Sequence, residues 1–230
     1  MNHYLDKVQR VFIGYDSTQD IAYHVLKHSI LKHATKPTWI VPIILKDLPW
    51  FNRPYDPLQS TEFTYTRFLV PYLCRFSGPA LFMDSDMLCL SDISELFSLY
   101  RKTSHAIFVR KHDHQPVETV KMRNKIQTSY PRKNWSSLML MDCSQLECWT
   151  RENVETKPAK WLHRFEPLED YRIGDISEEW NVLDKMDSDT KLIHYTSGGP
   201  WLQPHPFGYI WFQYKEMYEK EAAVRNYQAS

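Results

Sequence analysis

The chain has 230 residues, of which 43% are hydrophobic and 14% aromatic, a composition typical of a globular domain with a large core. Its 28 basic and 28 acidic residues balance, which removes the electrostatic argument for nucleic acid or an anionic membrane as a partner. The first residues hold no apolar signal segment, and no run approaches the roughly 20 apolar residues of a membrane span. We therefore expect a cytoplasmic protein. Peripheral association with the inner face of the membrane is compatible with this expectation.

The first hundred residues alternate between apolar runs and helical periodicity. Strands are expected at residues 11–15, 39–45 and 80–84, and helices at 19–34, 63–76 and 92–100. Pro42 places the second strand at a sheet edge or a bulge, because proline cannot donate a ladder hydrogen bond. Residues 46–60 contain three prolines and are expected to form a loop.

The second half continues the alternation. Strands are expected at 105–110, 137–141 and 191–194, helices at 145–154 and 209–225, and a weak helix or ordered loop at 117–128. Alternating strands and helices predict an α/β fold: a mainly parallel twisted sheet flanked by helices. We treat 1–230 as a single domain with 201–230 as its C-terminal helical segment.

The stretch ALFMDSDMLCL places Asp84 and Asp86 at the end of an apolar strand. Strand side chains alternate between faces, so both carboxylates are expected on one face with Ser85 on the other. Two close carboxylates repel each other unless a cation lies between them, and Mn²⁺ and Mg²⁺ prefer oxygen ligands. The sequence therefore predicts a divalent metal site here, although Asp and Ser also favour an ordinary acidic turn.

Four features together resemble the nucleotide-sugar glycosyltransferases of GT-A (Rossmann-like) fold, most closely glycosyltransferase family 8. They are the strand end Tyr15-Asp16, the arginine in YTRFLVP, the Asp-Ser-Asp motif and the late HYTSGGPW. The resemblance covers roughly residues 11–201 and is closest to an uncharacterised bacterial-type branch, with the stretches STEFTYTRFLVPYL, YPRKNWSS and EEWN.

The resemblance implies a ligand set and a nucleotide site. Asp84, Asp86 and His194 would hold Mn²⁺ (or Mg²⁺), and the metal would bridge the diphosphate of a UDP-sugar. The implied nucleotide-sugar contacts are Tyr15 and Asp16 (uracil and ribose), Arg67 (donor charge), Ser85 (ribose side), Asn134 (sugar), and Gly198 and Gly199 (phosphate). Trp180-Asn181 resembles a structural Trp-Asn of the family.

The chain departs from the family pattern at two places. The turn after His194 lacks the family's phosphate-binding lysine, for which Lys125, Arg123 or Lys133 would substitute from elsewhere in the chain. An Asp-Gln pair near the reacting carbon is also missing. The candidates for catalysis are Arg67, Asp113 and His163, and Asp175 is a further polar candidate near the reacting carbon.

These features predict a metal-dependent transferase that moves a hexose from a UDP-sugar to a glycan, a lipid-linked saccharide or a protein, with retention at the anomeric carbon. One alternative is a catalytically degenerate protein of the same fold that binds a nucleotide sugar or acts as a scaffold. A haloacid-dehalogenase-type phosphatase, which also uses Asp-x-Asp, is the other alternative. The sequence leaves a homodimer open.

Overall fold

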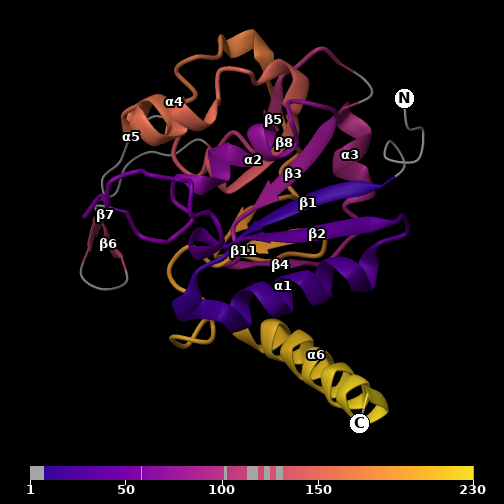
Figure 1. The fold of residues 1–230 in the computed structure, drawn as a ribbon. Coiled ribbons are helices and arrows are strands. Elements are labelled where there is room, and N and C mark those ends of the chain that lie inside the picture. The colour runs from indigo at the N-terminus through magenta and orange to yellow at the C-terminus, as the bar shows by residue number, and fades with distance from the viewer. Residues whose placement is uncertain are drawn as a thin grey trace.

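The computed structural model describes residues 8–57, 59–100, 103–112, 119–121, 125–127 and 132–229. A six-stranded sheet with the strand order β2-β1-β3-β8-β5-β9 forms its centre (Figure 1). Its strands are β1 (Gln9–Gly14), β2 (Thr38–Ile43), β3 (Pro79–Met83), β5 (Ile107–Val109), β8 (Leu138–Asp142) and β9 (Ile173–Asp175). Three of the five strand pairs are parallel, and only β8 runs against its neighbours β3 and β5. The predicted mainly parallel sheet is confirmed, and Pro42 lies on the edge strand β2.

Helices cover both faces of this sheet because the strand side chains alternate in direction. In β3, Ala80 and Phe82 join a core cluster shared with helical residues of α2 (Val70–Leu73), α4 (Arg151–Thr156) and α5 (Ala159–His163). Leu81 and Met83 join the opposite cluster, shared with α1 (Asp20–His33) and α3 (Ser94–Tyr100). The apolar run that precedes the Asp-Ser-Asp motif is therefore buried on both faces.

A second, smaller sheet has the order β10-β11-β4. Its strands are β4 (Met87–Cys89), β10 (Val182–Leu183) and β11 (Leu192–His194). Only residues 84–86 separate β3 from β4, so the chain passes from the large sheet to the small one at the Asp-Ser-Asp motif.

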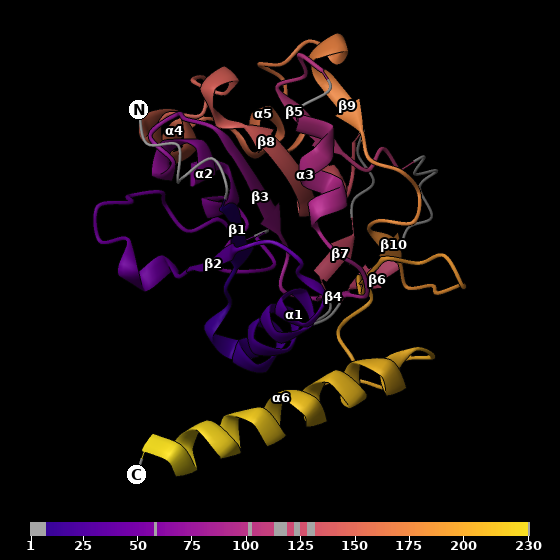
Figure 2. The same cartoon turned by 90° about the vertical axis from the view of Figure 1, so that its right-hand side faces the viewer.

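The long helix α6 (Gly208–Ala229) ends the described chain and lies beside α1, apart from the central sheet (Figure 2). Its Trp211 and Tyr214 pack with Val25 of α1 in a third core cluster that also contains β4 and β11 residues. No helix in the described part of the chain is both long and apolar enough to cross a membrane.

Several local expectations were wrong. In place of one helix over 63–76, the structure has a 3-10 turn at Thr66–Leu69 followed by the single-turn helix α2, and the chain then enters the left-handed region at Arg75 and Phe76. Pro71 lies in the first turn of α2, where its missing N–H costs no helical hydrogen bond.

Two further segments differ from expectation. The helix expected at 145–154 is shifted: α4 begins after Thr150, whose hydroxyl accepts a hydrogen bond from the Asn153 N–H at 3.1 Å. Within 117–128, the described residues form the antiparallel strands β6 (Thr119–Lys121) and β7 (Lys125–Gln127), not a helix.

Candidate functional site

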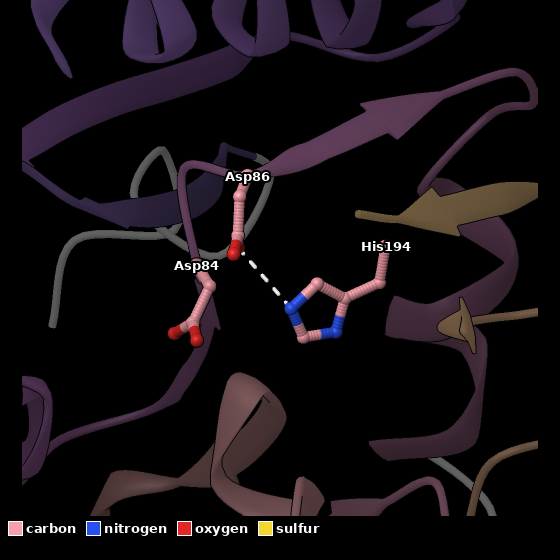
Figure 3. Close-up of side chains that lie close together, drawn as sticks. All are labelled: Asp84, Asp86 and His194. Atoms are coloured by element: carbon pink, nitrogen blue, oxygen red, sulfur yellow. Dashed lines mark ion pairs between the residues drawn. The ribbon is translucent and has the colours of Figure 1, made fainter. Parts of the chain in front are cut away.

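Three potential metal ligands meet where the two sheets join. One ligand atom from each of Asp84, Asp86 and His194 lies within 4.8 Å of the other two. Figure 3 shows the two carboxylates and the imidazole gathered around one space, with His194 Nε2 at 3.1 Å from Asp86 Oδ1. The structure thus brings together the three residues that the sequence motifs assigned to metal binding.

Backbone hydrogen bonds fix this arrangement. The Asp84 N–H donates to the Ser137 carbonyl at 2.9 Å, at the start of β8. The Tyr195 N–H donates to the Asp86 carbonyl, also at 2.9 Å, which extends the antiparallel pairing of β11 with β4. The main chain at each end of the motif is therefore attached to a different sheet.

Arg67 closes one side of the site. Its Nη1 lies 2.9 Å from Asp84 Oδ1 and donates to the Ser136 carbonyl at 2.9 Å, and the residue is only 7% exposed. The nearby acidic residue Glu62 instead accepts hydrogen bonds from the N–H and the hydroxyl of Ser17. A buried guanidinium beside the acidic motif suits an anionic ligand.

The electrostatics of the site favour a cation. The pKa of Asp84 is raised to about 6, mainly by burial and also by the charge of Asp86, although the Arg67 and His194 charges oppose the shift. Two oxygen ligands and one imidazole nitrogen suit Mn²⁺ or Mg²⁺ and leave coordination positions for phosphate oxygens. The donor set present here therefore fits the metal that the fold family implies.

Behind His194 lies a buried asparagine that the sequence suggested only as a structural residue. Asn181 is fully buried, and its Oδ1 lies 2.8 Å from His194 Nδ1. Its Nδ2 donates to Ser137 Oγ at 3.0 Å. No pattern around Asn181 would reveal these contacts, because Ser137 lies 44 residues away along the chain.

The residues expected to contact the nucleoside lie at the end of β1. The Tyr15 hydroxyl donates to Asp20 Oδ1 at 2.7 Å. Asp16 is buried and accepts hydrogen bonds from Thr18 and from the Glu62 N–H, so that its carboxylate joins the β1 end to the loop before Arg67. Between the two aspartates of the metal site, Ser85 is also buried.

The glycine turn after His194 has a packing role. A Cβ at Gly199 would lie 2.0 Å from the Trp201 ring, so that only glycine fits against this indole. Gly198 has a φ of 112°, in the region that favours glycine. Asp184 Oδ2 accepts hydrogen bonds from the hydroxyls of Thr196 and Ser197 at 2.6 and 2.8 Å and attaches this turn to the end of β10.

The remaining candidate site residues come from separate segments of the chain. His163 Nδ1 lies 3.0 Å from Ser136 Oγ, and the carbonyl of the same serine accepts a hydrogen bond from Arg67. Asn134 adopts a left-handed conformation, with a φ of 64°, and its carbonyl accepts from Ser137 Oγ. Lys125 belongs to β7, and Asp113 lies outside the described residues.

Several solved structures with a similar backbone are glycosyltransferases. The bifunctional glycosyltransferase WbbM has a TM-score of 0.59 at 14% identity, and the match covers 93% of this chain and 53% of that one. GlyE of Streptococcus pneumoniae TIGR4 has a TM-score of 0.60 at 12% identity, with 95% and 64% covered. The galactosyltransferase LgtC, in complex with donor and acceptor sugar analogues, has a TM-score of 0.55 at 10% identity, with 91% and 96% covered. The chain therefore has the GT-A glycosyltransferase fold and spans about half to two thirds of the first two matched proteins.

The sequence comparisons define the family. A model described as glycosyl transferase family 8 matches residues 44–177, which is more than half of the chain. Protein CDI of Arabidopsis thaliana is 43% identical over 230 residues, with 92% of this chain and 88% of that protein covered. The chain belongs to glycosyl transferase family 8, and this membership supports a nucleotide-sugar glycosyltransferase.

Proposed function

We propose that this protein transfers a hexose from a UDP-sugar to a saccharide, lipid-linked or protein acceptor, in a reaction that depends on Mn²⁺ or Mg²⁺. The observation that carries the proposal is the convergence of Asp84, Asp86 and His194 within 4.8 Å beside the buried Arg67. A divalent ion at this position would supply the positive charge that a departing diphosphate needs.

The chain's own residues complete the donor site in this proposal. Arg67 is fixed by Asp84 and by the Ser136 carbonyl, so its charge is preorganised beside the diphosphate and loses little side-chain entropy on binding. Tyr15 and Asp16 at the end of β1 would hold the uracil and ribose, with Ser85 on the ribose side.

The sugar and phosphate contacts follow from the same reasoning. Gly198 and Gly199 would let backbone N–H groups approach the phosphates, and Lys125 would replace the lysine that the turn lacks. Asn134 would contact the sugar, and Asp113 and His163 are the other candidates for catalysis. Transfer with retention, a cytoplasmic location and action by residues 1–230 as one domain are parts of the proposal.

Calorimetry of UDP binding tests the donor site. We expect binding with Mn²⁺, loss of binding with EDTA, and loss in Asp86→Asn, which removes one ligand charge with little change in volume. Glu216→Gln is the matched control, because it removes a carboxylate charge from the exposed surface of α6 and should bind UDP as the parent does. No binding of UDP under any condition would overturn the proposal.

A panel of UDP-hexoses then tests turnover through UDP release. Metal-dependent UDP release is expected with one donor of the panel. Binding without release from any donor would instead support the degenerate nucleotide-sugar-binding alternative, which the missing lysine and Asp-Gln pair favour. Membership of family 8 gives the phosphatase alternative no support.

A further inference from the structure

A chain of three hydrogen bonds, one partly buried and two buried, leads from a backbone carbonyl to the imidazole of His194. Ser137 Oγ donates to the Asn134 carbonyl at 2.6 Å, Asn181 Nδ2 donates to Ser137 Oγ at 3.0 Å, and Asn181 Oδ1 lies 2.8 Å from His194 Nδ1. Ser137, Asn181 and His194 are each less than 5% exposed, so water is a poor substitute for any of these contacts.

The direction of each bond follows from the first acceptor. A carbonyl can only accept, so the single hydroxyl proton of Ser137 is committed to Asn134. Ser137 Oγ can then only accept from Asn181, which requires the NH₂ of the asparagine amide to face the serine. The amide oxygen must therefore face His194, and His194 Nδ1 must carry a hydrogen.

We propose that Asn181 is a positioning residue that keeps the hydrogen of His194 on Nδ1, so that the lone pair of Nε2 is directed at Asp84 and Asp86 as a metal ligand. The metal part of this inference rests on the proposed function, whereas the position of the hydrogen does not. Imidazole ligands commonly donate their second N–H to such a partner, which fixes both the tautomer and the ring orientation.

The backbone conformation gives asparagine a second reason to occupy this position. Asn181 has a φ of 61°, a left-handed conformation that glycine and asparagine adopt more readily than other residues. Asn181→Gly therefore removes the amide while relieving backbone strain. Asn181→Asp retains an oxygen acceptor of the same size, and Ser137→Ala interrupts the chain one bond further from the histidine.

The first test needs no metal. We would record ¹⁵N NMR spectra of histidine-labelled, metal-free protein well above the usual histidine pKa of about 6.5, with the His194 signal assigned through His194→Gln. The expected spectrum shows hydrogen on Nδ1 of His194 in the parent and in Asn181→Asp, and its partial or complete loss from Nδ1 in Asn181→Gly; Nε2, which lies 3.1 Å from Asp86 Oδ1, is not the readout. An unprotonated Nδ1 in the parent would overturn the inference.

The second test measures Mn²⁺ affinity from the electron paramagnetic resonance signal of the free ion. We expect Asn181→Gly to weaken binding by about 10–100-fold, Ser137→Ala to weaken it less, and Asn181→Asp to bind at least as tightly as the parent. Rescue by aspartate separates positioning from mere packing, since both variants alter the same buried site. Unchanged affinity in Asn181→Gly, or equal losses in Asn181→Gly and Asn181→Asp, would overturn the inference.

The two proposals can fail separately. A parent protein that binds no Mn²⁺ contradicts the proposed function, and the NMR spectrum still decides where the His194 hydrogen lies. If Asn181→Gly does not fold, the Mn²⁺ affinities of Asn181→Asp and Ser137→Ala relative to the parent test the inference in its place.

Discussion

His163 offers a sharp test of the electrostatics around Arg67. It lies at the end of α5, and its ring packs edge-on against Phe68 with the centroids 5.0 Å apart. The pKa of His163 is lowered to about 3, mainly by burial and also by the nearby charges of Arg67 and Arg53. We therefore expect an uncharged His163 throughout the neutral range.

The sign of the pH effect follows from the two pKa values. An unfolded chain takes up a proton on His163 near pH 6.5, whereas the folded chain does so only near pH 3. As the pH falls from 6.5 toward 3, protonation therefore favours the unfolded state, and the stability contributed by the neutral ring is lost. One proton corresponds to about 1.4 kcal/mol per pH unit, so about 2 kcal/mol is lost by about pH 5.

The variant His163→Asn removes the titration and keeps an amide near Ser136 Oγ. Urea denaturation of the parent and the variant, at a pH above 7 and again near pH 5, gives the difference in unfolding free energy. The measurement above pH 7 serves as the internal control, because it reports only the packing cost of the substitution. We expect the parent to lose about 2 kcal/mol more than the variant between the two conditions. Equal losses would refute the assignment of a neutral, partly buried His163.

Three other substitutions test the site's construction. Arg67→Met leaves Asp84 buried without its cation, so we expect a loss of about 3–5 kcal/mol in unfolding free energy by urea denaturation; a loss under about 1 kcal/mol would contradict a buried pair. Gly199→Ala places a Cβ against the Trp201 ring and should cost about 1–3 kcal/mol, visible as a lower Tm and altered tryptophan fluorescence; an unchanged Tm would contradict the tight contact. Asp184→Ala removes the acceptor shared by Thr196 and Ser197, so amide hydrogen exchange should accelerate across 196–199; unchanged exchange would show that other contacts hold the turn.

The features that could be predicted from the sequence are local or strongly patterned. The apolar run before Asp84 predicted a strand, and β3 is that strand. The carboxylates of Asp84 and Asp86 do lie close together, but residues 84–86 form a turn between β3 and β4, so the strand alternation used to predict their shared face does not apply. His194 was linked to them only through the resemblance to family 8, because 108 positions separate it from Asp86 and no periodicity connects them. The parallel sheet followed from the alternation of strands with helices.

The failures come from tertiary contacts and from short elements. Strand β9 has only three residues, too few to show a period, and it is defined by its pairing with β5. The helix expected at 63–76 was wrong because its apolar residues are buried from a 3-10 turn and one helical turn, not from a regular helix. Asn181 and Ser137 were missed because an isolated polar residue gains its role only from the partner that folding brings to it.

The path of the chain explains how a small domain could hold its metal ligands rigidly. Asp84 directly follows β3 of the large sheet, Asp86 directly precedes β4 of the small sheet, and His194 is the last residue of β11. The short turn 134–137 contacts all parts of this junction: it binds Arg67 through the Ser136 carbonyl, Asp84 through the Ser137 carbonyl, and His194 through Asn181. Substitutions in this turn should therefore change metal affinity and the Arg67 contact together, although none of its side chains is a predicted metal ligand.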